Sequence, residues 1–374
     1  MSFHELLLKL AEKHEFPLVG ALDLDQVLTP EGLFQEHLNR YDSWLAEGRE
    51  GEMAYLRRGR ERRADPRLVF PAAQSIFCVA VPYERLARGE ADSTKGPRYA
   101  RYLRGKDYHD VIAERLERLM QEVAAEWNAQ GNTPITWKVC VDTSALLERS
   151  WAALTGLGWI GKNTTLINPK LGSYLFLGEV LISQKVDRGP ALLPNYCGSC
   201  TKCLTSCPTS AFTEPGTLDS RRCISYWTLE KRGELALGEK DRKAIGTWVA
   251  GCDICQEVCP FNLKPAREEV VGIDPTLPYS GQSDATSVAE WKALLCETTD
   301  AYKTRVDHSA LNRVKPQQFS RNLAIALSNA LSEFEFEQIA ELRPLIEQRV
   351  REETDPFAAQ EWSRLFQSLL NPSS

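Results

Sequence analysis

The sequence predicts an α/β domain, followed by a cysteine-rich domain and a C-terminal helical region. Three observations support this prediction. Strand-like apolar runs alternate with helical periodicity before residue 188, eight of the 11 cysteines fall between residues 197 and 259, and helical spacing returns from residue 317. We place the domain boundaries at residues 1–188, 189–265 and 266–374. A chain of 374 residues has room for two or three domains.

The composition is that of a globular protein. Hydrophobic residues make up 43% and charged residues 26% of the chain, which excludes a disordered chain, a collagen and a coiled coil. No apolar run approaches 18 residues, and the N-terminus lacks the pattern of a signal peptide. We therefore expect a cytoplasmic protein. The net charge of −6 argues against a binder of bulk nucleic acid but leaves room for local basic patches.

Strands and helices alternate in the first domain. Residues 75–83 are rich in β-branched and aromatic residues and read as a buried strand, and residues 135–141 alternate as a strand does. Residues 174–183 form another strand-like run after a turn signal at 168–172. The apolar positions between residues 108 and 128 have helical spacing, and Gly131 follows as a stop.

A second helix is expected to run to about residue 154, with N-cap residues supplied by Asp142, Thr143 and Ser144. Read from the residues alone, Asp142 is then a helix cap. The glycine-rich stretch 156–163, GLGWIGKN, fits neither a dinucleotide-binding fingerprint nor a phosphate loop, so it predicts either a ligand-binding loop or a tight turn.

The cysteine-rich segment carries the strongest motif. Residues 197–208 follow the pattern C-x2-C-x2-C-x3-C-P, which ligates [4Fe–4S] clusters in bacterial ferredoxins. A second run at residues 252–260 has one cysteine fewer, and the isolated Cys223 can supply the missing ligand. Because the fourth cysteine of such a run ligates the other cluster, we predict a ferredoxin-like domain with two clusters. Their ligands would be Cys197, Cys200, Cys203 and Cys259 for cluster 1, and Cys207, Cys223, Cys252 and Cys255 for cluster 2. Two structural zinc sites are the alternative.

The last third of the chain is predicted to be helical. Residues 287–300 have helical character, and the apolar positions from Leu323 to Val350 predict a pair of amphipathic helices. Basic residues gather in three places: residues 55–67, residues 95–106, and Arg313, Lys315 and Arg321. Clustered arginines and lysines bind phosphates, and the tyrosines among them can stack on unpaired bases. A solvated surface is the plainer interpretation of each run.

These motifs together resemble one family. The chain carries DYH at residues 107–109, DT at 142–143 with ER at 148–149, GLGWIGKN, GS at 172–173, both cysteine runs, and RNLAIALSN at 321–329. In this order they resemble the epoxyqueuosine reductases, cobalamin-dependent iron–sulfur enzymes of tRNA queuosine synthesis. The resemblance extends from about residue 15 to residue 350.

The resemblance implies a fold and a reaction. The α/β domain would be nitroreductase-like and bind cobalamin, and the C-terminal region would contain a HEAT-like repeat facing the tRNA. The enzyme would reduce epoxyqueuosine to queuosine at the tRNA wobble position, the last step of queuosine synthesis. Two [4Fe–4S] clusters would recharge the cobalamin with electrons from an unidentified low-potential donor. We expect a monomer, because the tRNA must reach one buried cofactor.

The resemblance also implies site residues. Asp142 corresponds to the catalytic acid, and burial beside the corrin would raise its pKa so that it holds a proton near neutral pH. The implied cobalamin contacts are Arg58, Arg104, His109, Asp142, Thr143, Arg149, Trp159, Lys162, Asn163, Gly172, Ser173, Ser225, Tyr226 and Asp253. The expected tRNA contacts are Arg60, Arg63, Arg98, Arg101, Arg313, Lys315 and Arg321.

Two other functions share part of this pattern. A reductive dehalogenase combines cobalamin with two clusters, although such enzymes usually carry a twin-arginine export signal that this sequence lacks. A non-catalytic iron–sulfur electron carrier would need the clusters but neither Asp142 nor the basic runs. Cobalt retention would separate a cobalamin enzyme from a plain ferredoxin, and activity on RNA would separate an enzyme from a carrier.

Overall fold

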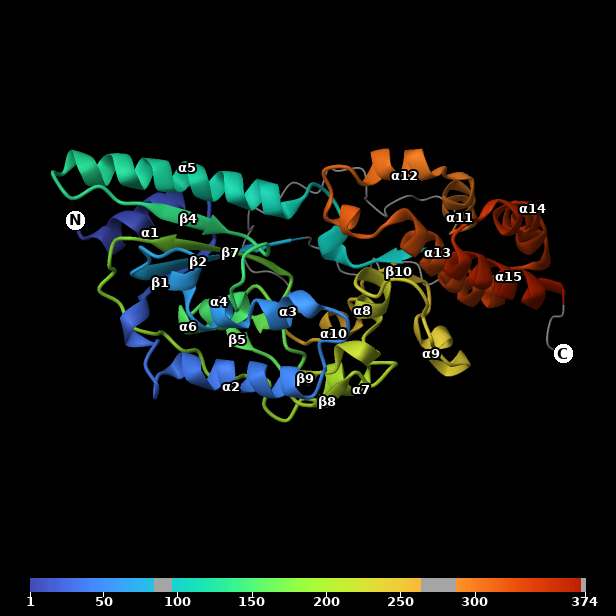
Figure 1. Cartoon of the computed structure of the whole chain (residues 1–374), viewed down its shortest axis with the longest axis horizontal. Helices are drawn as coiled ribbons and strands as arrows, with labels where there is room; N and C mark the ends of the chain where they lie inside the picture. Colours follow the sequence, from blue (N-terminus) through green and yellow to red (C-terminus); the bar gives the residue numbers. More distant parts are fainter. Residues whose placement is uncertain (84–95, 264–286, 371–374) are drawn as a thin grey trace.

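A four-stranded antiparallel sheet forms the centre of the first domain (Figure 1). The computed structural model describes residues 1–83, 96–263 and 287–370. The strand order is β1-β2-β7-β4, with β1 at Leu18–Asp23, β2 at Ser75–Pro82, β4 at Trp137–Cys140 and β7 at Leu175–Ile182. Strands β2 and β7 are the inner pair and are almost wholly buried, which explains their nearly continuous apolar sequences. The strands expected from residues 75–83, 135–141 and 174–183 are confirmed.

Two helices cover one face of this sheet. Helix α5 (Tyr108–Ala129) lies along the sheet and contacts α1 (Phe3–Lys13). The helical spacing predicted for residues 108–128 is confirmed, because Ile112, Leu116 and Leu119 point into the core and are completely buried. The first turn of α5 begins at the N-cap Asp107, whose side chain accepts a hydrogen bond from the backbone N–H of His109.

The opposite face is covered by α2 (Leu33–Ala46) and α6 (Glu148–Leu154), where Trp151 stacks on Phe34 with ring centroids 4.1 Å apart. The expected helix start at residues 142–144 is wrong, because α6 begins at Glu148 and its N-cap is Leu147. The reason is a positive φ of 55° at Asp142, which turns the chain away from a helical path directly after β4. Residues 142–147 are therefore a loop.

Shorter elements join the first domain to the cysteine-rich segment. The short strand β3 pairs in parallel with β10, which lies between the two cysteine runs, so these parts of the chain share a small sheet. The GLGWIGKN stretch contributes β5, which pairs with β6. The short strands are β3 (Arg98–Tyr99), β5 (Trp159–Ile160), β6 (Leu166–Ile167), β8 (Phe212–Glu214), β9 (Thr217–Leu218) and β10 (Trp248–Ala250). The short helices are α3 (Ala54–Arg58), α4 (Arg60–Ala64), α7 (Lys202–Thr205), α8 (Ile224–Leu229), α9 (Glu239–Ala244) and α10 (Ile254–Glu257).

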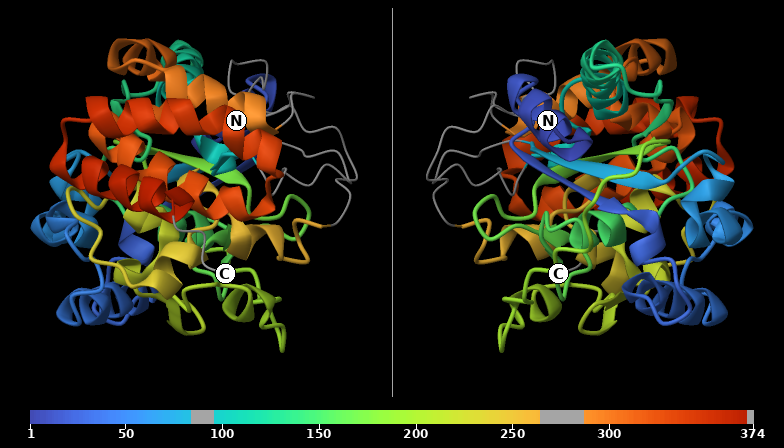
Figure 2. Two further views of the ribbon diagram at one scale, coloured as in Figure 1. Left: turned by 90° about the vertical axis from the view of Figure 1, so that its right-hand side faces the viewer. Right: turned by 90° about the vertical axis from the view of Figure 1, so that its left-hand side faces the viewer.

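The C-terminal helices pack together at one end of the molecule (Figure 2). They are α11 (Ser287–Cys296), α12 (Thr299–Val306), α13 (Pro316–Ala330), α14 (Phe336–Glu352) and α15 (Pro356–Leu370). The predicted amphipathic pair is confirmed as α13 and α14, and α15 packs against both. Trp291 and Trp362 are completely buried in this cluster, which also includes Val249 and Ala250 of β10. The helical region is thus anchored on the cysteine-rich segment.

Some expectations fall on residues that the structure does not describe. The domain boundary at 265/266 and Lys95 of the second basic run lie outside the described residues. Among the residues that are described, no helix is long and apolar enough to cross a membrane.

Candidate functional site

Asp142 occupies a strained turn where β4 leaves the sheet. Its φ of 55° lies in the left-handed region, which residues with a Cβ seldom adopt. The backbone N–H of Thr143 donates to the carbonyl of Val141 at 2.5 Å, so Asp142 is the central residue of a tight turn closed by an i to i+2 hydrogen bond. The side chain of Asp142 remains 43% exposed. Such strain is characteristic of functional sites.

His109 joins Asp142 to a second carboxylate. Its Nε2 lies 3.1 Å from Oδ2 of Asp142, and its Nδ1 is hydrogen-bonded to Oδ1 of Asp107. Burial lowers the pKa of His109, but the hydrogen bonds and charges of the two carboxylates outweigh burial and raise that pKa to about 9. His109 is therefore an imidazolium at neutral pH, held between two acids.

The protein groups around Asp142 act on its pKa in opposite directions. Burial raises the pKa of Asp142, but the hydrogen bond and charge of His109, with the charges of Arg313 and Arg149, lower it more. The net effect of the protein groups is a lowered pKa, which places the proton of this pair on His109. The expectation that burial beside a corrin keeps Asp142 protonated stays a prediction.

Arg313 brings the C-terminal region to the same place. Its Nη1 lies 4.0 Å from Oδ2 of Asp142, and its Nη2 lies 2.6 Å from Oε1 of Glu230 and 3.3 Å from Oη of Tyr55. Residues from the first domain, the end of α8 and the turn before α13 thus meet at one point. The sequence places Arg313 among the tRNA-contact candidates, and the structure puts it beside Asp142.

The glycine-rich stretch contacts both cysteine runs. Lys162 Nζ donates to the carbonyls of Gly198 and Cys200 at 2.6 and 3.0 Å, and Asn163 Nδ2 donates to the carbonyl of Cys255 at 3.4 Å. The indole N–H of Trp159 points at Sγ of Cys197, 3.5 Å away. These three expected cobalamin contacts are therefore already engaged in holding the cysteine loops.

Other expected cobalamin residues are buried between protein segments. Ser173 is hydrogen-bonded to Gln256 and Asn262, Asp253 accepts from the backbone N–H of Arg101, and the hydroxyl of Tyr226 accepts from the backbone N–H of Glu52. A Cβ at Gly172 would lie 2.1 Å from Oδ1 of Asn262, so this glycine permits a close approach of the chain. Among the other expected contacts, Arg58, Asp142, Thr143 and Arg149 are exposed, and Arg104, His109, Lys162 and Ser225 are half-buried.

The eight clustered cysteines form no disulfides and lie near one another. Burial raises the pKa of Cys203, and the thiols of Cys197, Cys259 and Cys200 raise it further. Burial raises the pKa of Cys252 well above its usual value, with Cys223 and Cys255 adding to the effect. Burial also raises the pKa of Cys255, whose neighbours include Cys203 of the first expected ligand set as well as Cys223 and Cys207 of the second. The two expected sets are therefore adjacent, and the assignment of each cysteine to one cluster stays a prediction.

Several expected tRNA contacts are not surface residues. Arg321 is 1% exposed and donates to the backbone carbonyls of Trp227, Lys231 and Gly233. Arg101 and Arg63 are also buried, at 9% and 8% exposure. A buried guanidinium cannot reach a phosphate, so the contact expected for these three residues is not supported. The remaining four candidates are Arg60, which pairs with Asp42, Arg98, which pairs with Glu257, Arg313, which pairs with Glu230, and the exposed Lys315.

Sequence reasoning missed two residues of this site. Tyr55 and Glu230 approach Arg313 from distant parts of the chain, and neither lies in a recognisable site motif. Asp107 was within the DYH motif, but only the structure shows that its carboxylate and that of Asp142 share one imidazole. No local pattern could have identified this pairing.

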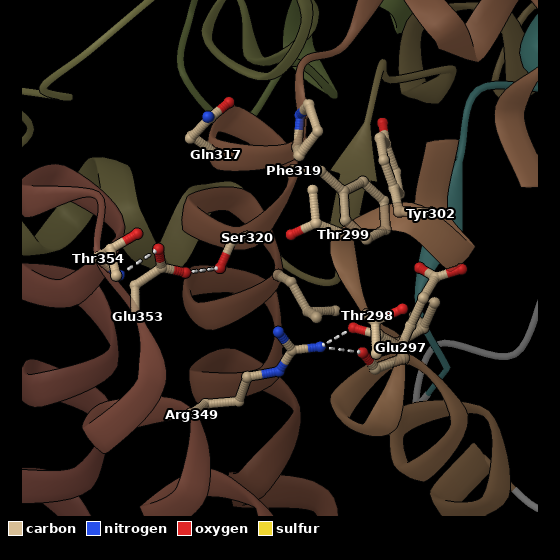
Figure 3. A pocket seen from close by; sticks show the side chains of 13 residues that line it. Glu297, Thr298, Thr299, Tyr302, Gln317, Phe319, Ser320, Arg349, Glu353 and Thr354 are labelled. Atoms are coloured by element: carbon tan, nitrogen blue, oxygen red, sulfur yellow. Dashed lines mark hydrogen bonds between the residues drawn. The ribbon is translucent and has the colours of Figure 1, made fainter. Parts of the chain in front are cut away.

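A small cavity of about 100 Å³ lies elsewhere, among the C-terminal helices (Figure 3). Arg349 crosses it and donates to the backbone carbonyls of Leu294 and Glu297, while Ser320 donates to Glu353. These polar groups are satisfied within the protein, and none of the residues lining the cavity belongs to the Asp142 site. We assign it a structural role.

Two family models match the chain. Residues 63–143 match "Epoxyqueuosine reductase QueG, DUF1730", and residues 196–262 match "4Fe-4S double cluster binding domain". The second match states that the cysteine-rich segment is an iron–sulfur domain. The first ends at Thr143, directly after the strained turn.

Curated relatives and solved structures agree with these matches. An epoxyqueuosine reductase of Synechococcus sp. (strain RCC307) is 38% identical, over 75% of this chain and 81% of the relative. One from Pseudomonas aeruginosa is 36% identical, over 85% of this chain and 82% of the relative. A crystal structure of epoxyqueuosine reductase with an epoxyqueuosine-modified tRNA-Tyr stem loop has a TM-score of 0.71 and 26% identity, covering 99% of this chain and all of that one. A Bacillus subtilis epoxyqueuosine reductase, with its catalytic aspartate loop swung out of the active site, has a TM-score of 0.70 at 25% identity, covering 98% and 99%.

Proposed function

Because the chain belongs to the epoxyqueuosine reductase family, we propose that it reduces epoxyqueuosine to queuosine at the wobble position of tRNA, the last step of queuosine synthesis. The observation that carries this proposal is the His109–Asp142 pair, which holds one proton beside an exposed carboxylate. An epoxide that becomes an alkene takes up two electrons and two protons, and its oxygen leaves as water. The site therefore needs a source of protons as well as of electrons.

We assign the proton transfer to Asp142 and its supply to His109. Asp142 is the exposed member of the pair, so it faces the substrate oxygen, while His109 is 23% exposed and backed by Asp107. A proton that leaves through Asp142 is replaced from the imidazolium, 3.1 Å away. Arg313 adds positive charge near the oxygen on which negative charge develops.

Cobalamin fits part of the residue set that the sequence suggested. The residues with surface left for it are Arg58, Asp142, Thr143 and Arg149, together with the half-buried Arg104, His109, Lys162 and Ser225. When bound, cobalamin supplies a strongly reducing centre for the electron transfer. The α/β domain that presents these residues would be of the nitroreductase-like type. In this proposal Trp159, Lys162, Asn163, Ser173, Tyr226 and Asp253 shape the wall between the cofactor and the clusters.

Two [4Fe–4S] clusters are proposed as the electron supply. The first would be held by Cys197, Cys200, Cys203 and Cys259, and the second by Cys207, Cys223, Cys252 and Cys255. The glycine-rich stretch touches a residue of each ligand set, through Trp159 at Cys197 and Asn163 at Cys255. Electrons would enter from a low-potential donor.

The tRNA is proposed to approach over Asp142 and the C-terminal helices. Arg313 and the exposed Lys315 lie at the junction between the first domain and α13, and α13 to α15 would form a HEAT-like, tRNA-facing cap. We propose that the protein works as a monomer in the cytoplasm. As in the Bacillus subtilis relative, the loop that carries the catalytic aspartate would move in this chain too.

The test is a direct assay on RNA. Anaerobically reconstituted protein with both clusters, cobalamin and a chemical reductant is incubated with an anticodon stem-loop that carries epoxyqueuosine, and the nucleosides are analysed by mass spectrometry. We expect the loss of one oxygen, dependent on cobalamin and strongly slowed in the Asp142→Asn variant. Intact epoxyqueuosine, with clusters and cobalt present, would refute the proposal and point to a carrier or to a dehalogenase-like activity.

A further inference from the structure

The loop that presents Asp142 is held by a contact that the chemistry described so far does not use. The backbone N–H of Asp142 donates to Oε1 of Glu148 at 2.6 Å. Glu148 is the first residue of α6, and this helix packs on β2 and β7. The carboxyl of Glu148 therefore extends from a rigid element to the backbone of the loop.

The loop of residues 142–147 begins with an unfavourable backbone conformation. Asp142 has a φ of 55°, and its turn is closed by the 2.5 Å bond from Thr143 to Val141. A left-handed conformation is unfavourable for a residue with a Cβ. It persists only when the surroundings hold it in place. Among the described residues, the side-chain acceptor bonded to the Asp142 N–H is that of Glu148.

From this geometry we propose that Glu148 is a positioning residue: its carboxyl latches the Asp142 backbone, and so keeps the Asp142 carboxylate within reach of His109 and the substrate. This inference rests on the proposed role of Asp142. Glu148 itself touches neither His109 nor the proposed path of the tRNA. Its effect is to set how often the loop occupies the position that is competent for proton transfer.

The surroundings of Glu148 favour the protonated, neutral form of its carboxyl group. Burial raises the pKa of Glu148 to about 8, the charge of Asp142 adds to this, and the Asp142 N–H, Arg149 and His109 oppose it. From β7, the fully buried Glu179 also faces it, and both oxygens of Glu179 lack a hydrogen-bond partner within the described chain. The thiols of Cys78 on β2 and Cys140 on β4 lie on the same side of the sheet. A neutral carboxyl still offers a carbonyl oxygen to the Asp142 N–H, and it does not repel the Asp142 carboxylate.

Two substitutions separate the latch from a merely structural role. Glu148→Gln keeps a carbonyl oxygen in the same place, whereas Glu148→Leu removes the acceptor at similar size. We expect Glu148→Leu to lower kcat on the epoxyqueuosine stem-loop by about tenfold or more, with KM for the RNA unchanged, because the left-handed turn at Asp142 then lacks the side-chain acceptor that holds its N–H. Glu148→Gln should restore kcat to near the wild-type value.

A second measurement needs no turnover. Hydrogen exchange of the holoenzyme, followed by mass spectrometry on a peptide spanning residues 141–147, reports the protection of the Asp142 amide. Exchange should be faster in Glu148→Leu and like wild type in Glu148→Gln. The matched control is Glu5→Leu, because Glu5 also accepts a backbone N–H, that of Ser2, in the first turn of a helix remote from the site. This control should change neither kcat nor exchange at 141–147.

The outcomes are distinct. Unchanged exchange and unchanged kcat in Glu148→Leu would overturn the latch, and so would equal losses in the Leu and Gln variants, since the Gln variant retains the acceptor. If the wild-type enzyme leaves epoxyqueuosine intact, the proposed function fails. The exchange data would still support or refute the latch in that case.

Discussion

Removing the charge of Asp142 is expected to lower the pKa of His109. His109 has a pKa of about 9 against an ordinary value of 6.5, because the carboxylates of Asp107 and Asp142 together outweigh its burial. The difference corresponds to about 3 kcal/mol of preference for the imidazolium in the folded protein. In Asp142→Asn one of the two carboxylates is lost and burial remains, so we expect the pKa of His109 to fall by about one unit or more.

Turnover should respond in two ways. At pH 7 the rate of Asp142→Asn should fall by about 100-fold or more, the usual contribution of a positioned general acid. The pH dependence follows from the sign of the His109 shift: the protonated imidazole is the active form, so wild-type turnover is kept below about pH 9 and lost above it. The residual turnover of the variant should be lost at a pH lower by about one unit or more.

The assay combines a pH–rate profile in single turnover with NMR titration of histidine-labelled protein. The chain contains only five histidines, so the His109 signal is assignable with a His109→Gln variant. Asp110→Asn is the matched control, because Asp110 is an exposed carboxylate on the same helix, next to His109, and should leave both the titration and the rate unchanged. An unshifted His109 titration, or near wild-type turnover in Asp142→Asn, would refute the reasoning.

Four further outcomes are expected. Glu179→Leu should stabilise the protein by about 1–3 kcal/mol, since it removes a buried acid whose oxygens have no hydrogen-bond partner among the described residues. The pKa of Glu179 is raised in the folded protein, so the free-energy cost of burying Glu179 grows as the pH rises above its unfolded pKa of 4.5. The gain in thermal stability should therefore be larger at pH 8 than at pH 5. Arg321→Met should destabilise the junction of α13 with the cysteine-rich segment by about 3–5 kcal/mol, because three backbone carbonyls lose a charged donor. We expect a lower unfolding temperature and faster hydrogen exchange near Gly233. Cys203→Ser and Cys255→Ser should each reduce iron from about eight to about four atoms per chain, whereas loss of about one zinc would contradict the cluster assignment. Lys315→Glu should weaken stem-loop binding and reduce its salt dependence, with kcat at saturating RNA unchanged; an unaltered salt dependence would place Lys315 outside the RNA interface.

Local sequence patterns were sufficient for much of the fold. The spacing of Ile112, Leu116 and Leu119 predicted α5 because one face of that helix must be buried against the sheet. The continuous apolar runs predicted β2 and β7 because inner strands are covered on both faces. The helix start at Asp142 was predicted wrongly, since a cap residue and a left-handed turn use the same residue types and the choice between them depends on Glu148.

The candidate site could be predicted only in part. Asp142, His109 and the eight cysteines lie in short motifs, so their residue types and spacing mark them in the sequence. The approach of Arg313 to Asp142 and its contact with Tyr55 could not be found in this way, because these residues meet only in the folded molecule; Tyr55 and Arg313 are 258 residues apart in the chain. The same holds for the position of the shared proton, which is determined by the number of carboxylates around His109.

By itself, the sequence determined the order of the strands and helices, the two cysteine runs and the family, since each is written in local periodicity or in short spacings. The tertiary structure decided which charged residues act at a surface and which act inside. Arg321 and Lys315 belong to one basic group in the sequence, yet packing of α13 buries the first against backbone carbonyls and leaves the second exposed. The residue type gives a side chain its charged group. Its pKa and its partners depend on burial and on neighbouring groups, and these are determined only by long-range packing.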